Sequence, residues 1–347
     1  MKKNIENEII RLIGDCAHEL FPEAKEVLKS PYIEFPQDEK FGDISTNIAM
    51  RVSKTAGRPA REIALILKEK MLVAISSHTL KDCVADIRVE GAGFINFYFS
   101  PSYLYGELSF ILKERDNALR LDLGGKKKVL IEFVSANPTG SLSVAHARQA
   151  AVGDALANLL NFLGFDVKKE YYLNDEGNQI NILGKSVELR LKELSGEETI
   201  FPQDYYQGQY IYDIAKEAKA QNIPVKQMGD FAASCILSVI RKELDDFGVR
   251  FDCWYSQKDL ARSGKIESSF AYLKEKGLLY DLDGALWFKS SAFGDDKDRV
   301  VIKSDGSYTY LAPDIAYHDD KFKRGFDWLI NLWGPDHHGY IGRLKAS

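Results

Sequence analysis

The chain has 347 residues, 45% of them hydrophobic and 28% charged, a composition that is typical of globular proteins and excludes a disordered chain. At about 150 residues per domain, this length favours two or three domains. The formal net charge is −5, so a nucleic-acid partner would have to be met by a local basic patch.

Cysteine usage and hydropathy indicate the cellular compartment. The four cysteines (Cys16, Cys83, Cys235 and Cys253) are far apart in the sequence and form no C-x-x-C pair, which argues against a zinc site and against a disulfide framework. The amino-terminal residues contain no apolar core of a secretion signal, and no run approaches about 18 apolar residues without a charge. We therefore expect a cytoplasmic protein that neither enters the secretory pathway nor spans a membrane.

The first part of the chain, residues 1–118, is predicted to form a small α+β domain. Its elements, in chain order, are helices over residues 2–28, 47–54 and 63–75 and strands over residues 84–89 and 94–99. Ser45 or Thr46 could cap the second helix.

The second part, residues 119–347, is predicted to be an α/β domain with a mostly parallel sheet. Its elements, in chain order, are a strand over 129–134, a helix over 144–163, strands over 165–173, 285–290 and 299–303, a helix over 314–323 and a strand over 328–333. The runs VLIEFV and WLINLW are typical of strands that are buried on both faces of a parallel sheet. The first strand, helix and strand predict a right-handed βαβ unit. Further helices between residues 176 and 284 indicate an insertion at about 190–284.

The helix over 144–163 carries apolar residues at helical spacing, and Gly164 is expected to end it. The predicted apolar stripe consists of Val144, Ala147, Ala151, Ala155, Leu156, Leu159, Leu160 and Leu163.

Two of the buried strands end in polar loops rich in Gly and Pro, SANPTGSLSVAH and GPDHHGY. Ligands of open parallel sheets bind at the carboxyl ends of the strands, so these loops predict a binding site. Asn137 supplies an amide, and Ser141 or Ser143 opens a helix whose free N–H groups attract phosphate. His146, in the first helical turn, could hydrogen-bond a phosphate oxygen. The alternative is that SANPTG is only a turn and that His146 is an ordinary surface residue.

Charged residues near these strand ends favour a cationic ligand. Glu132 interrupts an apolar strand, so its carboxylate must meet a cation or face a cavity, because burial without a partner costs several kcal/mol. Tyr310 and Asp314 are four residues apart and share a helix face, although Asp314 could also serve only as a helix-dipole partner. Two carboxylates near one cleft would suit a guanidinium, which offers carboxylates a planar fork of donors.

Other nucleotide and metal signatures are missing. No G-x-x-x-x-G-K-[ST] segment occurs, and Gly91-Ala92-Gly93 lacks the third glycine of a dinucleotide loop, so a bend between two strands is the better interpretation. His337 and His338 are adjacent, so their rings would point to opposite sides of an extended segment, and no metal site is predicted there.

The residues at this point resemble a known family. The run IEFVSANPTGSLSVAHARQAAVGDALANLL (residues 131–160) resembles the signature segment of bacterial arginyl-tRNA synthetases, which are class I aminoacyl-tRNA synthetases. The resemblance continues through EYYLNDEGNQI and through the long segment from GALWFKSS to GRLKA, and backwards into FGDISTNIAM and GAGFINF. It covers nearly the whole chain in the family's order. The resemblance implies a Rossmann-type catalytic domain preceded by an N-terminal domain that contacts the elbow of tRNA.

The resemblance also implies roles for individual residues. Ser143–His146 (SVAH) occupies the place of the class I HIGH motif, which makes Ser143 and His146 the catalytic candidates. The residues implied for ATP binding are Pro138, Thr139, Gly140, Ser143, Ala145, His146, Asp336 and His337. The residues implied for arginine binding are Glu132, Ser135, Asn137, His146, Tyr310, Asp314 and His338.

The implied function is that of an arginine–tRNA ligase. The carboxylate of L-arginine would attack the α-phosphorus of ATP, giving arginyl-adenylate and pyrophosphate, and the arginyl group would then pass to the terminal ribose of tRNA(Arg). Positioning and charge stabilisation would carry the reaction, without a covalent nucleophile. ATP would act as a substrate together with Mg²⁺, and we expect no tightly bound cofactor and a monomeric protein.

Two departures from the family pattern stand out. Ser143 replaces the first histidine of the HIGH motif and Ala145 replaces its glycine, which we expect to affect rate rather than chemistry. The chain also ends before a KMSKS loop and before the anticodon-binding domain of the family. We therefore expect an N-terminal and catalytic fragment that is impaired in turnover. The alternatives are a short paralogue that binds arginine as a regulatory module without charging tRNA, and another nucleotidyl transferase that acts on a small molecule.

Overall fold

The computed structural model describes residues 5–28, 33–118, 120–334 and 339–347. The chain forms two compact units, Met1–Leu119 and Arg120–Ser347, and each is described here by itself. The division lies next to the boundary that the sequence predicts at residue 118. Among the helices in these described ranges, none is both long enough and apolar enough to cross a membrane.

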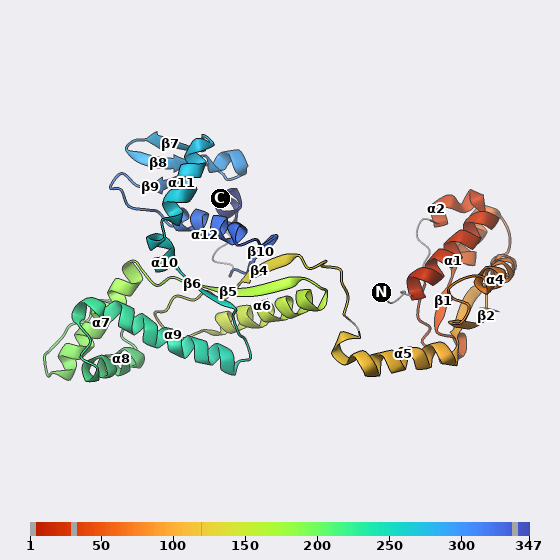
Figure 1. Ribbon diagram of the computed structural model, residues 1–347, viewed down its shortest axis with the longest axis horizontal. Coiled ribbons are helices and arrows are strands. Elements are labelled where there is room, and N and C mark those ends of the chain that lie inside the picture. Colours follow the sequence, from red (N-terminus) through yellow and green to blue (C-terminus); the bar gives the residue numbers. More distant parts are fainter. Residues whose placement is uncertain (1–4, 29–32, 119, 335–338) are drawn as a thin grey trace. The chain divides into compact units, whose positions relative to one another are not determined.

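The first unit combines helices with a three-stranded antiparallel sheet in the order β1-β3-β2 (Figure 1). Its elements are α1 (Ile5–Leu20), η1 (Pro22–Ala24), α2 (Lys25–Leu28), η2 (Glu39–Phe41), β1 (Ile44–Thr46), α3 (Ile48–Ala56), α4 (Ala60–Ser76), β2 (Val84–Glu90), β3 (Phe94–Phe99), α5 (Pro101–Glu114) and η3 (Arg115–Asn117). The core lies where α1 and α3 each pack against α4 and where α3 and α4 cover the sheet. None of the residues 101–114 of α5 is buried.

Two local predictions for this unit need correction or refinement, and a third is confirmed. The helix predicted over 2–28 is interrupted after Leu20, because Phe21 is not helical and Pro22 follows it. Of the two capping candidates, Thr46 accepts a hydrogen bond from the backbone of Ile48 at 3.3 Å. Ser45 is not a cap, because it lies in β1 and donates to Asn96 Oδ1 at 2.7 Å. The bend at Gly91–Gly93 does join β2 to β3.

The second unit is built on a four-stranded parallel sheet in the order β10-β4-β5-β6. Its strands are β4 (Lys128–Glu132), β5 (Asp166–Leu173), β6 (Cys253–Ser256) and β10 (Trp328–Asn331). The helix α6 (Val144–Phe162) connects β4 to β5, as the predicted βαβ unit requires. From β4 the chain continues to β5 on one side, whereas β10 lies on the other side. The crevice between β4 and β10 is therefore the topological switch point at which such sheets bind ligands.

The remaining elements form two groups (Figure 1). The first group comprises α7 (Asn178–Leu194), α8 (Gln209–Ala220), η4 (Val225–Gln227) and α9 (Met228–Asp246). The second comprises α10 (Gln257–Arg262), α11 (Lys265–Glu275), the antiparallel strands β7 (Leu279–Leu282), β8 (Ala285–Phe288) and β9 (Arg299–Ile302), η5 (Ser290–Phe293), α12 (Leu311–Lys323) and α13 (Ile341–Ala346). The strand β6 lies within the range 190–284 that the sequence assigns to an insertion, yet it belongs to the main sheet.

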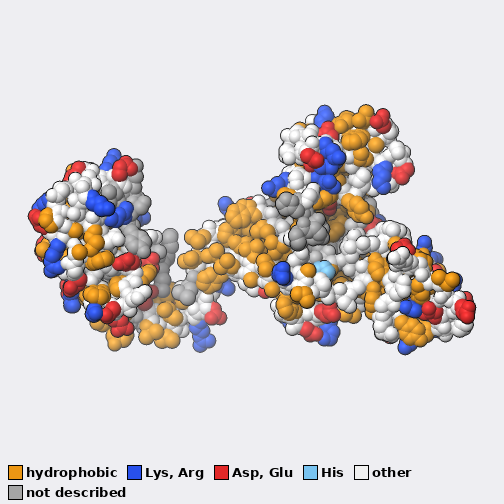
Figure 2. All heavy atoms as spheres, turned by 180° about the vertical axis from the view of Figure 1, so that it is seen from behind, with side chains coloured by type: hydrophobic (Ala, Val, Ile, Leu, Met, Phe, Trp, Pro, Cys, Tyr) orange, Lys and Arg blue, Asp and Glu red, His pale blue; other side chains and the backbone are white. Residues whose placement is uncertain are grey.

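The helix α6 packs on the sheet through small residues rather than through the predicted apolar stripe. Its buried residues are Ala150, Gly153 and Ala157. A Cβ atom at Gly153 would lie 2.3 Å from Cγ of the buried Phe133, so the helix approaches the sheet too closely for a side chain at that position. The predicted stripe is only partly a buried face: Leu156 and Leu160 pack half-buried against the core, whereas Val144 is 82% and Leu159 55% exposed. Figure 2 shows hydrophobic side chains at the surface of both units.

The close contact at Gly153 predicts an unusual response to alanine. We expect Gly153→Ala to lower the free energy of unfolding by about 1–3 kcal/mol, because overpacking against Phe133 outweighs the gain in helix propensity. The matched control is Gly106→Ala in α5, where a Cβ would meet no atom within 4 Å. It should stabilise the first unit by up to about 1 kcal/mol. Denaturant unfolding of both variants checks this, and a Gly153→Ala protein as stable as the parent would contradict the packing argument.

Candidate functional site

A row of polar side chains crosses the sheet near the carboxyl ends of its strands. Glu132 is the last residue of β4, and its Cα partners are Asn331 at the end of β10 and Glu170 in β5. In-register neighbours in a parallel sheet point to the same face, so these three side chains lie side by side. The helix α12 supplies the groups that meet them.

Glu132 forms a buried ion pair with Lys321. The Lys321 Nζ atom lies 2.6 Å from Glu132 Oε2, and the exposed fractions of the two side chains are 1% and 12%. The same ammonium group lies 4.0 Å from the centre of the Tyr317 ring. Burial by itself raises the pKa of Glu132, but the charge and hydrogen bond of Lys321, the nearby His318 and the Ser135 hydroxyl outweigh it and lower the pKa. Glu132 is therefore an ionised carboxylate.

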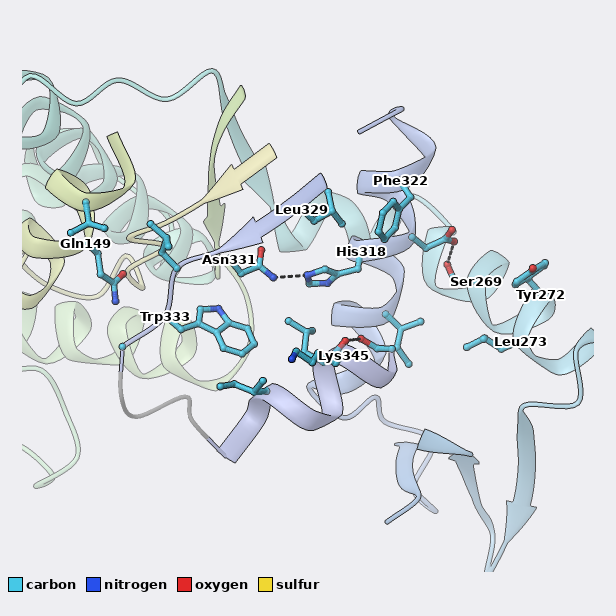
Figure 3. A pocket seen from close by; sticks show the side chains of 18 of the residues that line it. Gln149, Ser269, Tyr272, Leu273, His318, Phe322, Leu329, Asn331, Trp333 and Lys345 are labelled. Carbon is cyan, nitrogen blue, oxygen red and sulfur yellow. Dashed lines mark hydrogen bonds between the residues drawn. The ribbon is translucent and has the colours of Figure 1, made fainter. Parts of the chain in front are cut away.

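Asn331 connects this ion pair to a neutral histidine. Its Oδ1 accepts from Lys321 Nζ at 3.1 Å, which leaves Nδ2 to donate to His318 Nε2 at 2.9 Å (Figure 3). His318 Nδ1 then donates to the backbone carbonyl of Asp314 at 2.8 Å. Burial and the charge of Lys321 lower the pKa of His318 to about 4, so the ring is neutral with its proton on Nδ1.

Glu170 is fully buried and has its own cation. Arg324 holds it with both guanidinium nitrogens, at 2.5 Å to Oε2 and 3.0 Å to Oε1. The Tyr317 hydroxyl donates to Oε1 at 2.7 Å. Each glutamate of the row is therefore matched by one basic residue, Lys321 in the last turn of α12 and Arg324 at its C-cap.

A cavity of about 550 Å³ opens above this row. Its lining includes the carboxylate-bearing residues Glu132 and Asp314, the basic residues Arg299 and Arg343, and the aromatic residues Tyr172, Tyr310, Tyr317 and Tyr340. Asp314 lies in the first turn of α12, and its Oδ2 accepts a hydrogen bond of 2.6 Å from the Tyr340 hydroxyl. Tyr310 is 82% exposed at the rim. This arrangement is a pocket with acidic groups in an aromatic wall.

A larger cavity of about 1060 Å³ lies beside the first and shares His318, Asn331 and Trp333 with it (Figure 3). Its lining is mainly apolar, including Leu329 of β10 and Phe322 of α12. No group of three or more His, Cys, Asp and Glu side chains in the described part of the chain is placed to hold a metal ion.

The loop after β4 has a strained backbone. Val134 and Ser135 have φ values of 67° and 41°, and the Ser135 N–H bonds to the Phe133 carbonyl across a three-residue turn. The Ser135 hydroxyl accepts from the backbone of Tyr172 at 3.1 Å and donates to Glu132 Oε1 at 3.1 Å. Strain of this kind persists only where the surroundings hold it, and it clusters at functional sites.

Side chains from three other elements fix the rest of this loop. The Tyr171 hydroxyl of β5 donates to the Ala136 carbonyl at 2.9 Å. Gln179 of α7 accepts from the Asn137 amide at 2.7 Å. Tyr210 of α8 donates to the Thr139 carbonyl at 2.8 Å.

Ser143 and His146 form a capping box at the start of α6. The Ser143 hydroxyl accepts from the His146 backbone at 3.5 Å, and His146 Nδ1 accepts from the Ser143 backbone at 3.0 Å. The neutral ring therefore carries its proton on Nε2. Ser143 and Ala145 are exposed at this helix end.

The structure separates the residues that the sequence nominates. Glu132, Ser135, Tyr310 and Asp314 line the smaller cavity. The loop and helix-start residues, which do not line it, are Asn137, Pro138, Thr139, Gly140, Ser143, Ala145 and His146. Asp336, His337 and His338 lie outside the described residues.

Sequence reasoning missed several residues that shape the site. His318 and Lys321 lie on the helix that carries Asp314, four and seven positions beyond it, where helical spacing could have placed them on one face. Asn331 ends the strand WLIN just as Glu132 ends its own strand, so the strand-end argument applies to it equally. The tyrosines Tyr171 and Tyr210 carried no sequence signal, because their partners are backbone carbonyls distant in sequence.

Comparison with family models gives two matches. Residues 107–340 match the model described as tRNA synthetases class I (R), catalytic domain, and residues 1–99 match the arginyl tRNA synthetase N terminal domain.

Curated relatives and a solved structure agree with these matches. The chain is 45% identical to the arginine–tRNA ligase of Citrifermentans bemidjiense over 324 residues, an alignment that covers 90% of this chain and 57% of that protein. It is 44% identical to the arginine–tRNA ligase of Geobacillus thermodenitrificans, in an alignment that covers 100% of this chain and 62% of that protein. A crystal structure from Campylobacter jejuni, described as an arginyl-tRNA synthetase, aligns with a TM-score of 0.66 at 39% identity, over 71% of this chain and 56% of that one. The chain thus spans about three fifths of the length of these curated relatives.

The buried pair of Glu132 and Lys321 makes a strong prediction for stability. Lys321→Met should lower the free energy of unfolding by about 3–5 kcal/mol, because it leaves a buried carboxylate without its cation. The double variant Lys321→Met/Glu132→Gln should recover part of that loss. Lys323→Met is the control, since the ammonium of Lys323 is 61% exposed and should contribute less than about 0.5 kcal/mol. Denaturant unfolding of these variants and of Glu132→Gln alone measures the coupling, and strictly additive losses of the two single variants would contradict the pairing.

The neutral His318 predicts a pH dependence. Its resonances should titrate at about 4, with the neutral form protonated on Nδ1, in ¹⁵N NMR. As the pH falls below about 6.5, His318 of the unfolded chain binds a proton, whereas His318 of the folded chain stays neutral until about pH 4. His318 should therefore lower the free energy of unfolding progressively between about pH 6.5 and 4. His318→Gln should flatten this part of the stability profile. Titration of His318 near the ordinary histidine value would disprove the assignment.

Proposed function

The chain belongs to the class I tRNA synthetase family for arginine, and on that premise we propose that it carries the arginine- and ATP-binding part of an arginine–tRNA ligase. The proposed overall reaction joins L-arginine to tRNA(Arg) with cleavage of ATP. The arginine carboxylate oxygen forms a bond to the α-phosphorus, the α–β phosphoanhydride bond breaks, and pyrophosphate leaves with its Mg²⁺. We propose no tightly bound cofactor, and a monomeric protein in the cytoplasm.

The observation that carries this proposal is the cavity at the switch point between β4 and β10, where the Asp314 carboxylate lies among aromatic rings. We assign the substrate guanidinium to Asp314, which presents a carboxylate from the first turn of α12 into that cavity. The aromatic rings around it, Tyr172 and Tyr340, suit the planar cation. Burial raises the pKa of both phenols, and the charge of Asp314 adds to that effect, which supports their closeness to its carboxylate.

Glu132 has a different role in this proposal from the one that the sequence suggested. Lys321 already balances its charge at 2.6 Å. We therefore propose that Glu132 acts through its Oε1 atom, which Ser135 fixes at 3.1 Å, as a hydrogen-bond acceptor rather than as the main counterion of the ligand.

We propose the start of α6 and the loop before it as the ATP site. The free N–H groups of the helix start attract phosphate, and His146 can donate from Nε2 because its Nδ1 is engaged in the cap. Pro138, Thr139 and Gly140 would lie along the nucleotide. Asn137 and Ser135 would orient the arginine α-amino group between the two substrates. Charge stabilisation and positioning would then carry the reaction.

Calorimetric titration with L-arginine and with L-citrulline tests the pocket. We expect saturable binding of arginine and none of citrulline, whose carbonyl oxygen would face the carboxylate in place of a donor. Asp314→Asn should weaken arginine binding about 10- to 100-fold, as the loss of a charged hydrogen bond predicts.

Asp319→Asn is the matched control, because Asp319 is on the same helix but is engaged by Lys323 and Ser269. It should bind arginine as the parent does. Equal binding of arginine and citrulline, or an unchanged Asp314→Asn protein, would refute the assigned pocket.

A further inference from the structure

We propose that Tyr210 is a positioning residue for the proposed ATP-binding loop. This inference rests on the function proposed above, but it concerns a residue of the α7–α9 group and not of the pocket. The Tyr210 hydroxyl donates to the Thr139 carbonyl at 2.8 Å. It is the contact through which α8 holds the centre of the loop that precedes α6.

The loop itself has little internal support at this point. The Thr139 N–H bonds to the Asn137 carbonyl at 2.8 Å, a three-residue turn around Pro138. Such a turn fixes only one residue, and the backbone before it is strained at Val134 and Ser135. Contacts from outside the loop must therefore set its position.

The tyrosine lies beside the loop. A Cβ atom at Gly140 would be 3.6 Å from the Tyr210 hydroxyl oxygen, an ordinary van der Waals distance, so the phenol is next to the backbone that the resemblance assigns to ATP. A Cβ at Gly208 would lie 2.5 Å from the Tyr210 ring, so a side chain there would displace it. Burial raises the pKa of the half-buried phenol, and its hydroxyl therefore stays protonated as a donor.

The α8 helix is well anchored to act as a support. It buries Ile211, Ile214 and Ala215 in the core of the second unit. The segment before it is tied to α7, because the Tyr206 N–H donates to Ser186 Oγ at 3.0 Å and Arg190 donates to the Gln207 carbonyl at 2.7 Å. Gln179 of α7 also reaches the loop, through Asn137 at 2.7 Å. The position of the loop is thus set by the same helices that form the α7–α9 group.

Tyr210→Phe tests this role, because it removes the hydroxyl and keeps the ring. Hydrogen exchange followed by mass spectrometry should show about fivefold faster exchange of the amides in residues 136–143, and calorimetry about fivefold weaker binding of Mg·ATP, as the loss of one hydrogen bond predicts. Arginine binding should weaken less than Mg·ATP binding, because Asn137 is the only residue of 136–143 proposed to contact arginine, and Gln179 also holds it. Tyr212→Phe is the control, since its ring contacts Lys216 on the same helix, and it should behave as the parent.

The outcomes separate this inference from the proposed function. A parent chain that binds Mg·ATP, with Tyr210→Phe binding it equally or exchanging no faster, would overturn the positioning role alone. Equal weakening of ATP and arginine binding would also overturn it, because that result indicates general destabilisation. A parent chain that binds no Mg·ATP would refute the proposed ATP site, and with it any role of Tyr210 in ATP binding.

Discussion

Two glutamates side by side at the end of a buried parallel sheet are the constraint on which the rest of the second unit depends. Glu132 and Glu170 are cross-strand partners, and burying a carboxyl group without a partner would be costly. The carboxyl end of α12 meets each with its own cation, Lys321 in the last turn and Arg324 at the C-cap. The placement of α12 over the strand ends therefore follows from charge compensation as much as from hydrophobic packing, and it brings Asp314 to the cavity.

The same network gives the cavity its chemical character. Lys321 balances the charge of Glu132 and donates to Asn331 Oδ1, so that the Asn331 amide donates to His318 Nε2. The neutral His318 then donates from Nδ1 to the backbone carbonyl of Asp314. In this series of hydrogen bonds each group acts as donor or acceptor in only one way. The series therefore fixes the helix turn that carries Asp314 relative to the sheet. A site that must orient a planar, charged ligand benefits from such a fixed surrounding.

The loop before α6 follows a different principle. Its backbone is strained where it leaves β4, and side chains from β5, α7 and α8 hold it in addition to its own two short turns. The proposed ATP site and the proposed arginine site thus depend on different supports, one on the helices after β5 and the other on α12. They meet at Ser135, which bonds to both Glu132 and the β5 backbone.

The sequence by itself determined the elements whose cause is local. Residues close together in the chain predict the apolar strands β4 and β10, the βαβ connection, the end of α6 at Gly164 and the need of Glu132 for a cation or a cavity. The resemblance added the family. Only the tertiary structure decided which cation Glu132 meets, since Lys321 is 189 positions away. It also decided which face of α6 is buried: periodicity identifies a helix, but the close approach of Phe133 selects the face with Gly153. Both the partner of Glu132 and the buried face of α6 depend on packing between segments distant in sequence, which no local pattern predicts.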